Sequence, residues 1–189
     1  MMLLVWLCAA YLIGAIPTGV LLTRLAGRED IRQSGSGNIG ATNVYRVAGR
    51  TLGVVTLIGD CLKGLLPVLA AQQFLQLDTR SVALIALVTF LGHCYPIYLG
   101  FKGGKGVATS LGIFLVLSPL AVLVALVVFL LVLGLWRYIS LASVSAAAVI
   151  PFLVLFFSGA TPLFISSLIM AALVIWKHKT NIERLRSGS

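Results

Sequence analysis

Three polar, glycine-rich stretches interrupt an otherwise apolar chain, and they carry the side chains best suited to chemistry. They read SGSGNIGATNVYR at 34–46, GHCYPIYLGFKGGKGVAT at 92–109 and KHKTNIERL at 177–185. Glycines allow consecutive backbone N–H groups to approach a ligand, while Ser, Asn, Lys, Arg and His side chains hold phosphate. The three stretches together predict an anion site beside lipid, formed where they meet on one face of a membrane.

Two nucleotide-binding motifs are excluded by their context. Residues 35–40 match GxGxxG, but a charged segment precedes them and no βαβ unit of the required length follows. Residues 103–106 resemble a Walker loop, but no Ser or Thr follows Lys105 and the first glycine of that motif is missing. A flexible basic loop is the simpler interpretation of any one stretch. Three stretches that each combine cations with uncharged donors favour a binding site.

The two histidines and two further polar positions allow more than one interpretation. His178 lies between two lysines and suits anion binding or proton transfer, whereas His93 lies at a membrane edge, where packing is favoured over catalysis. Asp60 and Lys63 are one turn apart within an apolar run, so they can pair; a structural or site-bracing role is favoured over a direct one. Ser143 either permits close helix packing or offers its hydroxyl to the site.

His178 and Glu183 form an H-x4-E pair, similar to the H-x4-D dyad of acyl-CoA-dependent glycerolipid acyltransferases. Five residues along a helix turn through about 500°, which leaves the two side chains about 140° apart. The pair is therefore rejected as a catalytic dyad.

Composition indicates a polytopic membrane protein. The chain has 189 residues, of which 60% are hydrophobic and 10% charged, with a net charge of +9. The positive charge lies mostly in the connections, so cytoplasmic loops and an anionic substrate explain it, and nucleic acid is not expected as a partner. The three cysteines form no CxxC and predict reduced thiols. Neither a metal site nor a cofactor is expected, because too few carboxylates are present to hold Mg²⁺.

The apolar runs and the distribution of cations predict an all-α protein with seven transmembrane helices in one domain, 1–189. The runs are approximately 2–25, 52–72, 82–98, 107–136, 139–157 and 162–176. The fourth run is too long for one crossing, so we expect a break at Ser118–Pro119. With that break nearly all cations face one side and Arg80 the other, which places the N-terminus outside and the C-terminus in the cytoplasm. The segment 107–117 is short for a crossing and is expected to be tilted or partial.

Taken together, the three stretches resemble the three signature motifs of the bacterial acyl-phosphate:glycerol-3-phosphate acyltransferase family (PlsY type). The resemblance covers the whole chain, in the order and spacing of the motifs and in the apolar segments between them. Tyr95 and Tyr98 stand where phenylalanine is frequent, a mild departure that leaves the chemistry unchanged. The resemblance implies a small integral enzyme of the bacterial cytoplasmic (inner) membrane, with its active site at the cytoplasmic face.

The implied reaction moves a fatty acyl group from acyl phosphate to the sn-1 hydroxyl of glycerol 3-phosphate. Its products are lysophosphatidic acid and phosphate, in the first step of bacterial phospholipid synthesis. The resemblance therefore implies glycerol 3-phosphate and acyl phosphate as substrates, in place of acyl-CoA, and membrane lipids as surroundings. The family lacks the H-x4-D dyad, which agrees with its rejection here.

By the same resemblance, Ser36, Arg46, Lys105 and His178 are the expected catalytic residues. The expected substrate-binding residues are polar and glycine positions of the motifs and one serine outside them: Gly37, Asn38, Gly40, Thr42, Asn43, Gly103, Gly104, Gly106, Ser143, Lys177 and Asn181. Lys105, Arg46 and Ser36 are expected to neutralise the leaving phosphate and the oxyanion. His178, Asn181 and Ser143 are expected to clamp glycerol 3-phosphate.

Acyl phosphate is a mixed anhydride with a good leaving group, so the enzyme must mainly orient it, neutralise charge and help to remove one proton. No Ser–His–Asp set is evident, so direct attack is expected without an acyl-enzyme. The proton acceptor is a substrate phosphate oxygen or His178, and the former is favoured. The competing classes are an organic-phosphate transporter and a scaffold that binds anionic lipid. Basic groups at one face, with no visible inverted repeat, argue against transport.

Overall fold

The computed structural model describes residues 2–159 and 161–187, and every regular element among them is a helix. In chain order these are α1 (Met2–Ala15), α2 (Thr18–Leu25), α3 (Ala41–Ala48), α4 (Arg50–Leu69), η1 (Ala70–Phe74), α5 (Thr79–Cys94), η2 (Ile97–Leu99), α6 (Val107–Leu117), α7 (Pro119–Trp136), α8 (Ile139–Ser158), α9 (Thr161–Lys177) and α10 (Lys179–Ser187). The all-α prediction is confirmed for these residues.

The helices are long and apolar enough for a membrane protein. Four of them meet the length and composition of a membrane span, or up to six spans if each of two bent pairs counts as one. The remaining apolar helix, α6, has 11 residues. At about 1.5 Å per residue it extends roughly 16 Å, about half of a ~30 Å hydrocarbon core. The seven-crossing count therefore depends on α6 as a partial crossing and stays a prediction.

Prolines set the ends of several helices. Pro119 is the first residue of α7, so the predicted break at Ser118–Pro119 is confirmed. The first apolar run, expected as one span, is instead divided at Ile16–Pro17, where α1 and α2 bend by 47°. Pro17 has no N–H to continue the α1 hydrogen-bond ladder, which explains the break. A second bend, of 49°, separates α9 from α10 at His178.

Small residues bring two pairs of helices into close contact. Gly14 of α1 lies against the Thr89 backbone of α5, and Gly92 of α5 lies against the α1 backbone in return. In α4 and α6, Gly64 and Gly112 make the same reciprocal contact. A Cβ at any of these four positions would overlap the facing backbone. Such packing is typical of membrane helices, and it fixes α5 and α6, which flank the second polar stretch.

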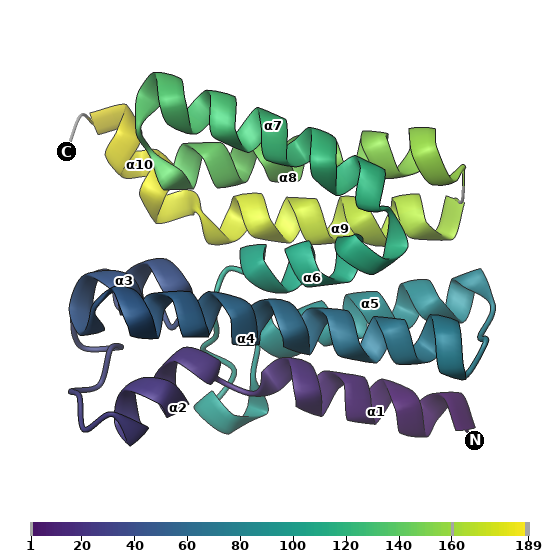
Figure 1. Cartoon of the computed structure of the whole chain (residues 1–189), viewed down its shortest axis with the longest axis horizontal. Helices are drawn as coiled ribbons and strands as arrows, with labels where there is room; N and C mark the ends of the chain where they lie inside the picture. The colour runs from purple at the N-terminus through teal and green to yellow at the C-terminus, as the bar shows by residue number, and fades with distance from the viewer. Residues whose placement is uncertain (1, 160, 188–189) are drawn as a thin grey trace.

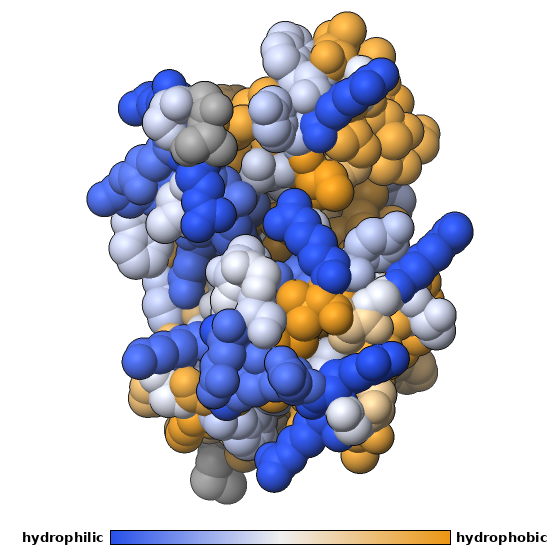
Figure 2. All heavy atoms as spheres, turned by 90° about the vertical axis from the view of Figure 1, so that its left-hand side faces the viewer, coloured by the Kyte–Doolittle hydropathy of each residue, from blue (hydrophilic) through white to orange (hydrophobic). Residues whose placement is uncertain are grey.

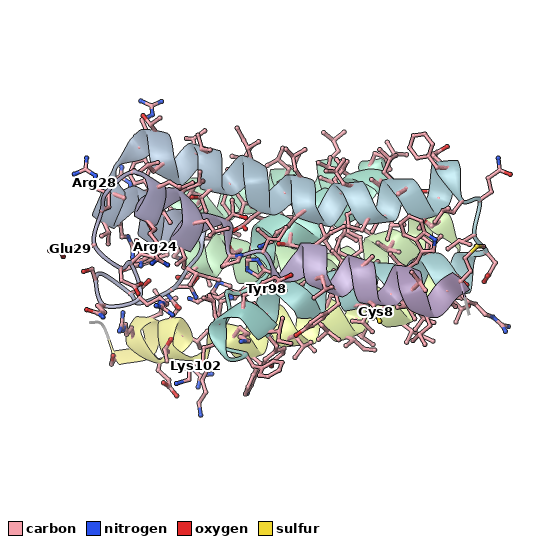
Figure 3. All side chains as sticks on the ribbon, turned by 90° about the horizontal axis from the view of Figure 1, so that it is seen from below. Cys8, Arg24, Arg28, Glu29, Tyr98 and Lys102 are labelled. Atoms are coloured by element: carbon pink, nitrogen blue, oxygen red, sulfur yellow. The ribbon has the colours of Figure 1, made fainter. Side chains whose placement is uncertain are left out.

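The polar elements gather at one end of the bundle. In Figure 1, α2, α3, α10 and the turn between α7 and α8 lie at the left-hand end, with the N-terminus and the start of α5 at the other. Figure 3 shows Arg24, Arg28 and Glu29 at the same left-hand end and Cys8 towards the opposite one. Tyr98 and Lys102 lie between them. The picture agrees with the predicted separation of charge, and the assignment of this end to the cytoplasm stays a prediction.

Candidate active site

The first polar stretch is folded around Asn43. This side chain lies on α3, is buried, and uses its amide on three backbone groups. Its Oδ1 accepts from Ser36 N at 2.8 Å, and its Nδ2 donates to Ile31 O at 2.9 Å and to Ser34 O at 3.2 Å. A small apolar cluster that includes Ile31 and Val44 packs beneath the stretch. The arrangement holds the loop that presents the exposed Ser36 beside α3.

Arg46 occupies the last turn of α3, one turn after Asn43. Its side chain is exposed. Because Asn43 binds the backbone of Ser36, both Ser36 and Arg46 are positioned by the same short helix. The first stretch thus supplies a hydroxyl and a guanidinium from one rigid unit.

The second stretch approaches the core so closely that side chains are excluded at several of its glycines, among them Gly104 and Gly106. Gly104 N donates to His93 O at 3.1 Å, and a Cβ on Gly104 would overlap the His93 imidazole ring. Gly106 has φ 83°, in the left-handed region, and a Cβ there would overlap the Phe90 ring. Glycine is therefore required at both positions, which flank Lys105.

The third stretch meets Lys105. The Lys105 ammonium donates to Asn181 Oδ1 on α10, and Arg184 lies one turn further along that helix. The buried His178, at the bend between α9 and α10, has Nδ1 2.7 Å from Val174 O. A carbonyl oxygen only accepts, so Nδ1 carries the hydrogen, and neutral His178 presents Nε2 as an acceptor.

The charge of Lys105 is destabilised in the free protein. Burial, as the largest cause, and the charges of Arg184 and Arg46 together lower its pKa to about 8. Arg46, from the first stretch, and Arg184, from the third, are therefore close enough for their charges to act on Lys105. An anion bound between the three cations would relieve their repulsion, which is the electrostatic character of a phosphate site.

An apolar groove opens beside this cation cluster. It encloses about 320 Å³ between α4, α6, α7, α8 and α9. Val107 and Ala108, directly after the Lys105 loop, line one part of it, and Val174, whose carbonyl holds His178, lines another. Ser143 also lines the groove, and its Oγ donates to Ile139 O at 2.8 Å. The groove therefore begins next to the Lys105 loop and next to the bend at His178, so an apolar cavity adjoins the cations.

The structure brings together most of the residues that the sequence predicted for the site. Arg46, Lys105, His178 and Asn181 converge, and hydrophilic side chains cover much of this end of the molecule (Figure 2). Ser36 is held beside α3, and Gly103 and Gly104 shape the Lys105 loop. Exposed Thr42 and Gly37, together with Gly40, belong to the first unit.

Three predicted substrate-binding residues have structural contacts of their own. The Lys177 side chain contacts the start of the second stretch. Its Nζ donates to Cys94 O at 2.8 Å and lies 4.2 Å from the centre of the Tyr95 ring. Asn43 binds backbone, as described above. Asn38 Oδ1 accepts from Gly40 N at 2.9 Å. These contacts give each of them a role in shaping the site, and direct contact with substrate stays a prediction.

Sequence reasoning missed Arg184 and Ser110. Arg184 lies at i+3 from Asn181, so the helical spacing of the third stretch could have indicated it. Ser110 lines the groove, and its Oγ is buried without a hydrogen-bond partner in the described part of the chain. The rejection of the H-x4-E pair is consistent with the structure, since exposed Glu183 lies 3.9 Å from Lys179 Nζ.

Metal ligands are not grouped near these residues. Among residues 2–159 and 161–187, no three His, Cys, Asp or Glu side chains are arranged to hold a metal ion. The chemistry available at the mouth of the groove is therefore that of cations, hydroxyls, an amide and an imidazole.

Comparison with known proteins gives matches over nearly the whole chain. Residues 4–188 match the family described as glycerol-3-phosphate acyltransferase. The glycerol-3-phosphate acyltransferase of Syntrophotalea carbinolica is 62% identical over 185 residues, covering 98% of this chain and 94% of the relative. That of Geotalea daltonii is 58% identical, covering 98% and 95%.

Two solved structures share the fold. One is the crystal structure of PlsY (YgiH), an integral membrane glycerol 3-phosphate acyltransferase, in its glycerol 3-phosphate form, with a TM-score of 0.93 and 39% identity. It is matched over 100% of this chain and 94% of that one. The lysophosphatidic acid form has a TM-score of 0.91 and 38% identity, over 100% and 93% of the two chains.

Proposed function

The chain belongs to the glycerol-3-phosphate acyltransferase family, and we propose that it moves a fatty acyl group from acyl phosphate to the sn-1 hydroxyl of glycerol 3-phosphate. The observation that carries the proposal is the cation cluster at the mouth of an apolar groove. Such a site can hold two anionic head groups in the polar mouth and one acyl tail in the channel. The similar PlsY structures, in glycerol 3-phosphate and lysophosphatidic acid forms, support the same acceptor and product.

The acyl tail is proposed to lie in the groove between α4, α6, α7, α8 and α9. Its wall consists of Ala, Val, Leu, Ile, Phe and Met side chains with three serines. An acyl chain there would place its carbonyl beside Lys105, because Val107 and Ala108 form the adjoining part of the wall. This geometry gives the orientation on which a large share of the rate depends.

The reaction itself needs no covalent intermediate with the protein. The sn-1 hydroxyl oxygen attacks the acyl carbonyl carbon, the bond from that carbon to the phosphate oxygen breaks, and an ester forms. Lys105, Arg46 and Ser36 stabilise the oxyanion and the departing phosphate. His178, Asn181 and Ser143 hold glycerol 3-phosphate in line for the attack.

A substrate phosphate oxygen is proposed to take the hydroxyl proton. The cations beside it keep the leaving group in place as it gains that proton. His178 is the second candidate, since Nε2 is its free acceptor, and kinetics separate the two roles. If His178→Ala raises KM for glycerol 3-phosphate and leaves kcat unchanged, His178 binds and is not the base.

The protein is proposed to work in the bacterial cytoplasmic membrane, with the polar end facing the cytoplasm. Seven crossings, with α6 as a partial one, put the N-terminus outside and the C-terminus inside. Glycerol 3-phosphate would then enter the polar mouth from water, and the acyl donor would enter the groove from lipid.

The deciding experiment mixes purified protein in detergent with radiolabelled glycerol 3-phosphate and either acyl phosphate or acyl-CoA. We expect labelled lysophosphatidate with acyl phosphate and none with acyl-CoA. A transporter or a lipid-binding scaffold would give no product in detergent, and product from acyl-CoA alone would contradict the proposed donor. A Lys105→Ala variant prepared in parallel controls for contaminating enzymes.

A further inference from the structure

Three ionisable side chains are buried together just beneath the site. Asp60 and Lys63 of α4 and His93 of α5 are 2%, 5% and 3% exposed. Lys63 Nζ lies 2.8 Å from Asp60 Oδ1, and His93 Nδ1 lies 3.9 Å from the same oxygen. Charged groups within a membrane protein are expensive and usually functional. The role of this cluster is not accounted for by the phosphate site above it.

Lys63 reaches the break between α1 and α2. Its Nζ donates to Ile16 O at 2.7 Å, directly before Pro17. The bend at this carbonyl directs α2 towards the first polar stretch, where Gly19 packs against the Ile39 backbone and the Val44 side chain. Lys63 thereby fixes the helix on which the Ser36 and Arg46 unit rests.

His93 supports the second stretch from below. Its backbone oxygen accepts from Gly104 N, and its ring occupies the space where a Gly104 side chain would be. The Nδ1 edge of the ring faces Asp60 and has no hydrogen-bond partner among the described residues. The position of this ring therefore limits how closely the loop that carries Lys105 can approach α5.

We propose that Asp60, Lys63 and His93 are positioning residues that hold the two phosphate-binding segments in register, without contact to substrate. Lys63 anchors the first segment through the Ile16 carbonyl, His93 anchors the second through Gly104, and the Asp60 carboxylate lies between the two anchors, 2.8 Å from Lys63 Nζ and 3.9 Å from His93 Nδ1. The proposal rests on the proposed acyltransferase function for its kinetic test. It adds to that function the group that keeps Arg46 and Lys105 close despite their repulsion.

Stability alone does not require these charges. Replacing a buried ion pair by apolar or neutral side chains of similar size is often neutral or stabilising, whereas removing one partner leaves a costly unpaired charge. The double variant Asp60→Asn/Lys63→Met removes both charges together. It therefore separates a positioning role from a merely structural one.

We expect the double variant to melt near the wild-type temperature and to lose on the order of 100-fold in kcat/KM for glycerol 3-phosphate, since a displacement of about 1 Å has that effect. The matched control is Thr89→Val, one turn before His93 on α5 and equally buried, whose Oγ1 binds only Ile85 O. This control should keep wild-type turnover. Wild-type turnover in a folded double variant would overturn the proposal.

His93 provides a test that does not depend on the ion pair. Asn places an amide nitrogen near the position of Nδ1, which faces Asp60, whereas Gln places it near Nε2. We expect His93→Asn to retain most of kcat/KM and His93→Gln to lose it, at similar melting temperatures. Equal losses in the two variants would contradict the contact with Asp60.

Hydrogen exchange measures the positioning without any turnover. In the double variant, the amides of Ile16, Thr18 and Gly19 and of residues 102–106 should exchange at least about tenfold faster than in wild type, while those of α8 stay unchanged. If wild-type protein makes no lysophosphatidate, the proposed function fails, and faster exchange in both segments would still support the cluster. Unchanged exchange in both segments would overturn the positioning role whatever the activity.

Discussion

The part of the bundle formed by α1, α4, α5 and α6 differs from the part formed by α7, α8 and α9 in how its helices are held together. In the first part, glycines bring backbones into contact, and Lys63 and Tyr11 donate to carbonyls of other elements, Ile16 O and Tyr95 O. The spans that include α4 and α5 are 39% and 56% buried, against 17% for α7 and 28% for α8. Under the proposed function, the first part is the scaffold that supports the phosphate site and the second forms the less buried wall of the groove.

The difference teaches that, under the proposed function, the two demands fall mainly on different helices, although α4 and α6 also line the groove. A site for two phosphates needs cations fixed to within a fraction of an ångström, so its supports are polar and close-packed. A site for an acyl chain needs an apolar surface that a lipid can enter sideways, and the low burial of α7 and α8 suits that proposed role. We therefore expect substitutions in the scaffold to affect turnover, and substitutions in the wall to affect the choice of acyl chain.

The largest effect is expected at Lys105. Lys105→Ala removes the cation nearest to the reacting groups, so turnover should fall by roughly 10²–10³-fold or more, with insertion unchanged. The matched control is Lys102→Ala, an exposed lysine of the same loop. Lysophosphatidate formation by purified protein measures both. Full activity of a correctly inserted Lys105→Ala protein would remove Lys105 from the mechanism.

The second effect compares a glycine of the loop between α5 and α6 with a glycine of α7. Gly104→Ala must displace the His93 ring, so the Lys105 loop shifts and kcat/KM for glycerol 3-phosphate should fall about 100-fold. Gly134→Ala on α7 meets no atom within 4 Å and replaces a helical glycine, so activity should be unchanged and stability equal or higher. Similar losses at the two positions would show that the scaffold and the wall do not differ in this way.

The third effect is on the pH profile. The pKa of Lys105 is lowered to about 8, so its charge is present below that pH and lost above it. Because kcat/KM reports groups of the free enzyme, it should fall about tenfold per pH unit above 8. Arginine stays charged in this range, so any residual activity of Lys105→Arg should lack the alkaline decline. An identical decline in that variant would assign the titration to another group.

The smallest effect is expected in the wall. Ala147 lines the groove, and Ala147→Phe would shorten the space for an acyl chain. We expect kcat/KM for a long-chain acyl phosphate to fall roughly 5- to 30-fold, about 1–2 kcal/mol, with little change for a short chain. Leu131→Phe, on an exposed position of α7, is the control. Equal losses for both chain lengths would place the acyl tail elsewhere.

Local signals in the sequence were sufficient for the membrane class and the break at Ser118–Pro119, while Arg46, Lys105, His178 and Asn181 were assigned to one site through the family resemblance of the three stretches. They were not sufficient for contacts that depend on tertiary packing. The bend at Ile16–Pro17 was missed although Pro17 is a local signal for it, but no local signal indicates that Lys63 of α4 donates to the Ile16 carbonyl there. The basic cluster around Lys177 indicated a cation of the site, but Lys177, at the end of α9, donates to Cys94 O. No spacing along the chain places Asp60 beside His93.

The central claim is that three separate stretches form one phosphate site, and hydrogen exchange with glycerol 3-phosphate tests it most directly. Purified protein is titrated with glycerol 3-phosphate, and amide protection is followed in residues 34–46, 92–109 and 177–185. We predict that all three become protected at the same ligand concentration, and that Lys105→Ala abolishes the protection in all of them. Protection of one stretch alone, or saturation at clearly different concentrations, would contradict the account.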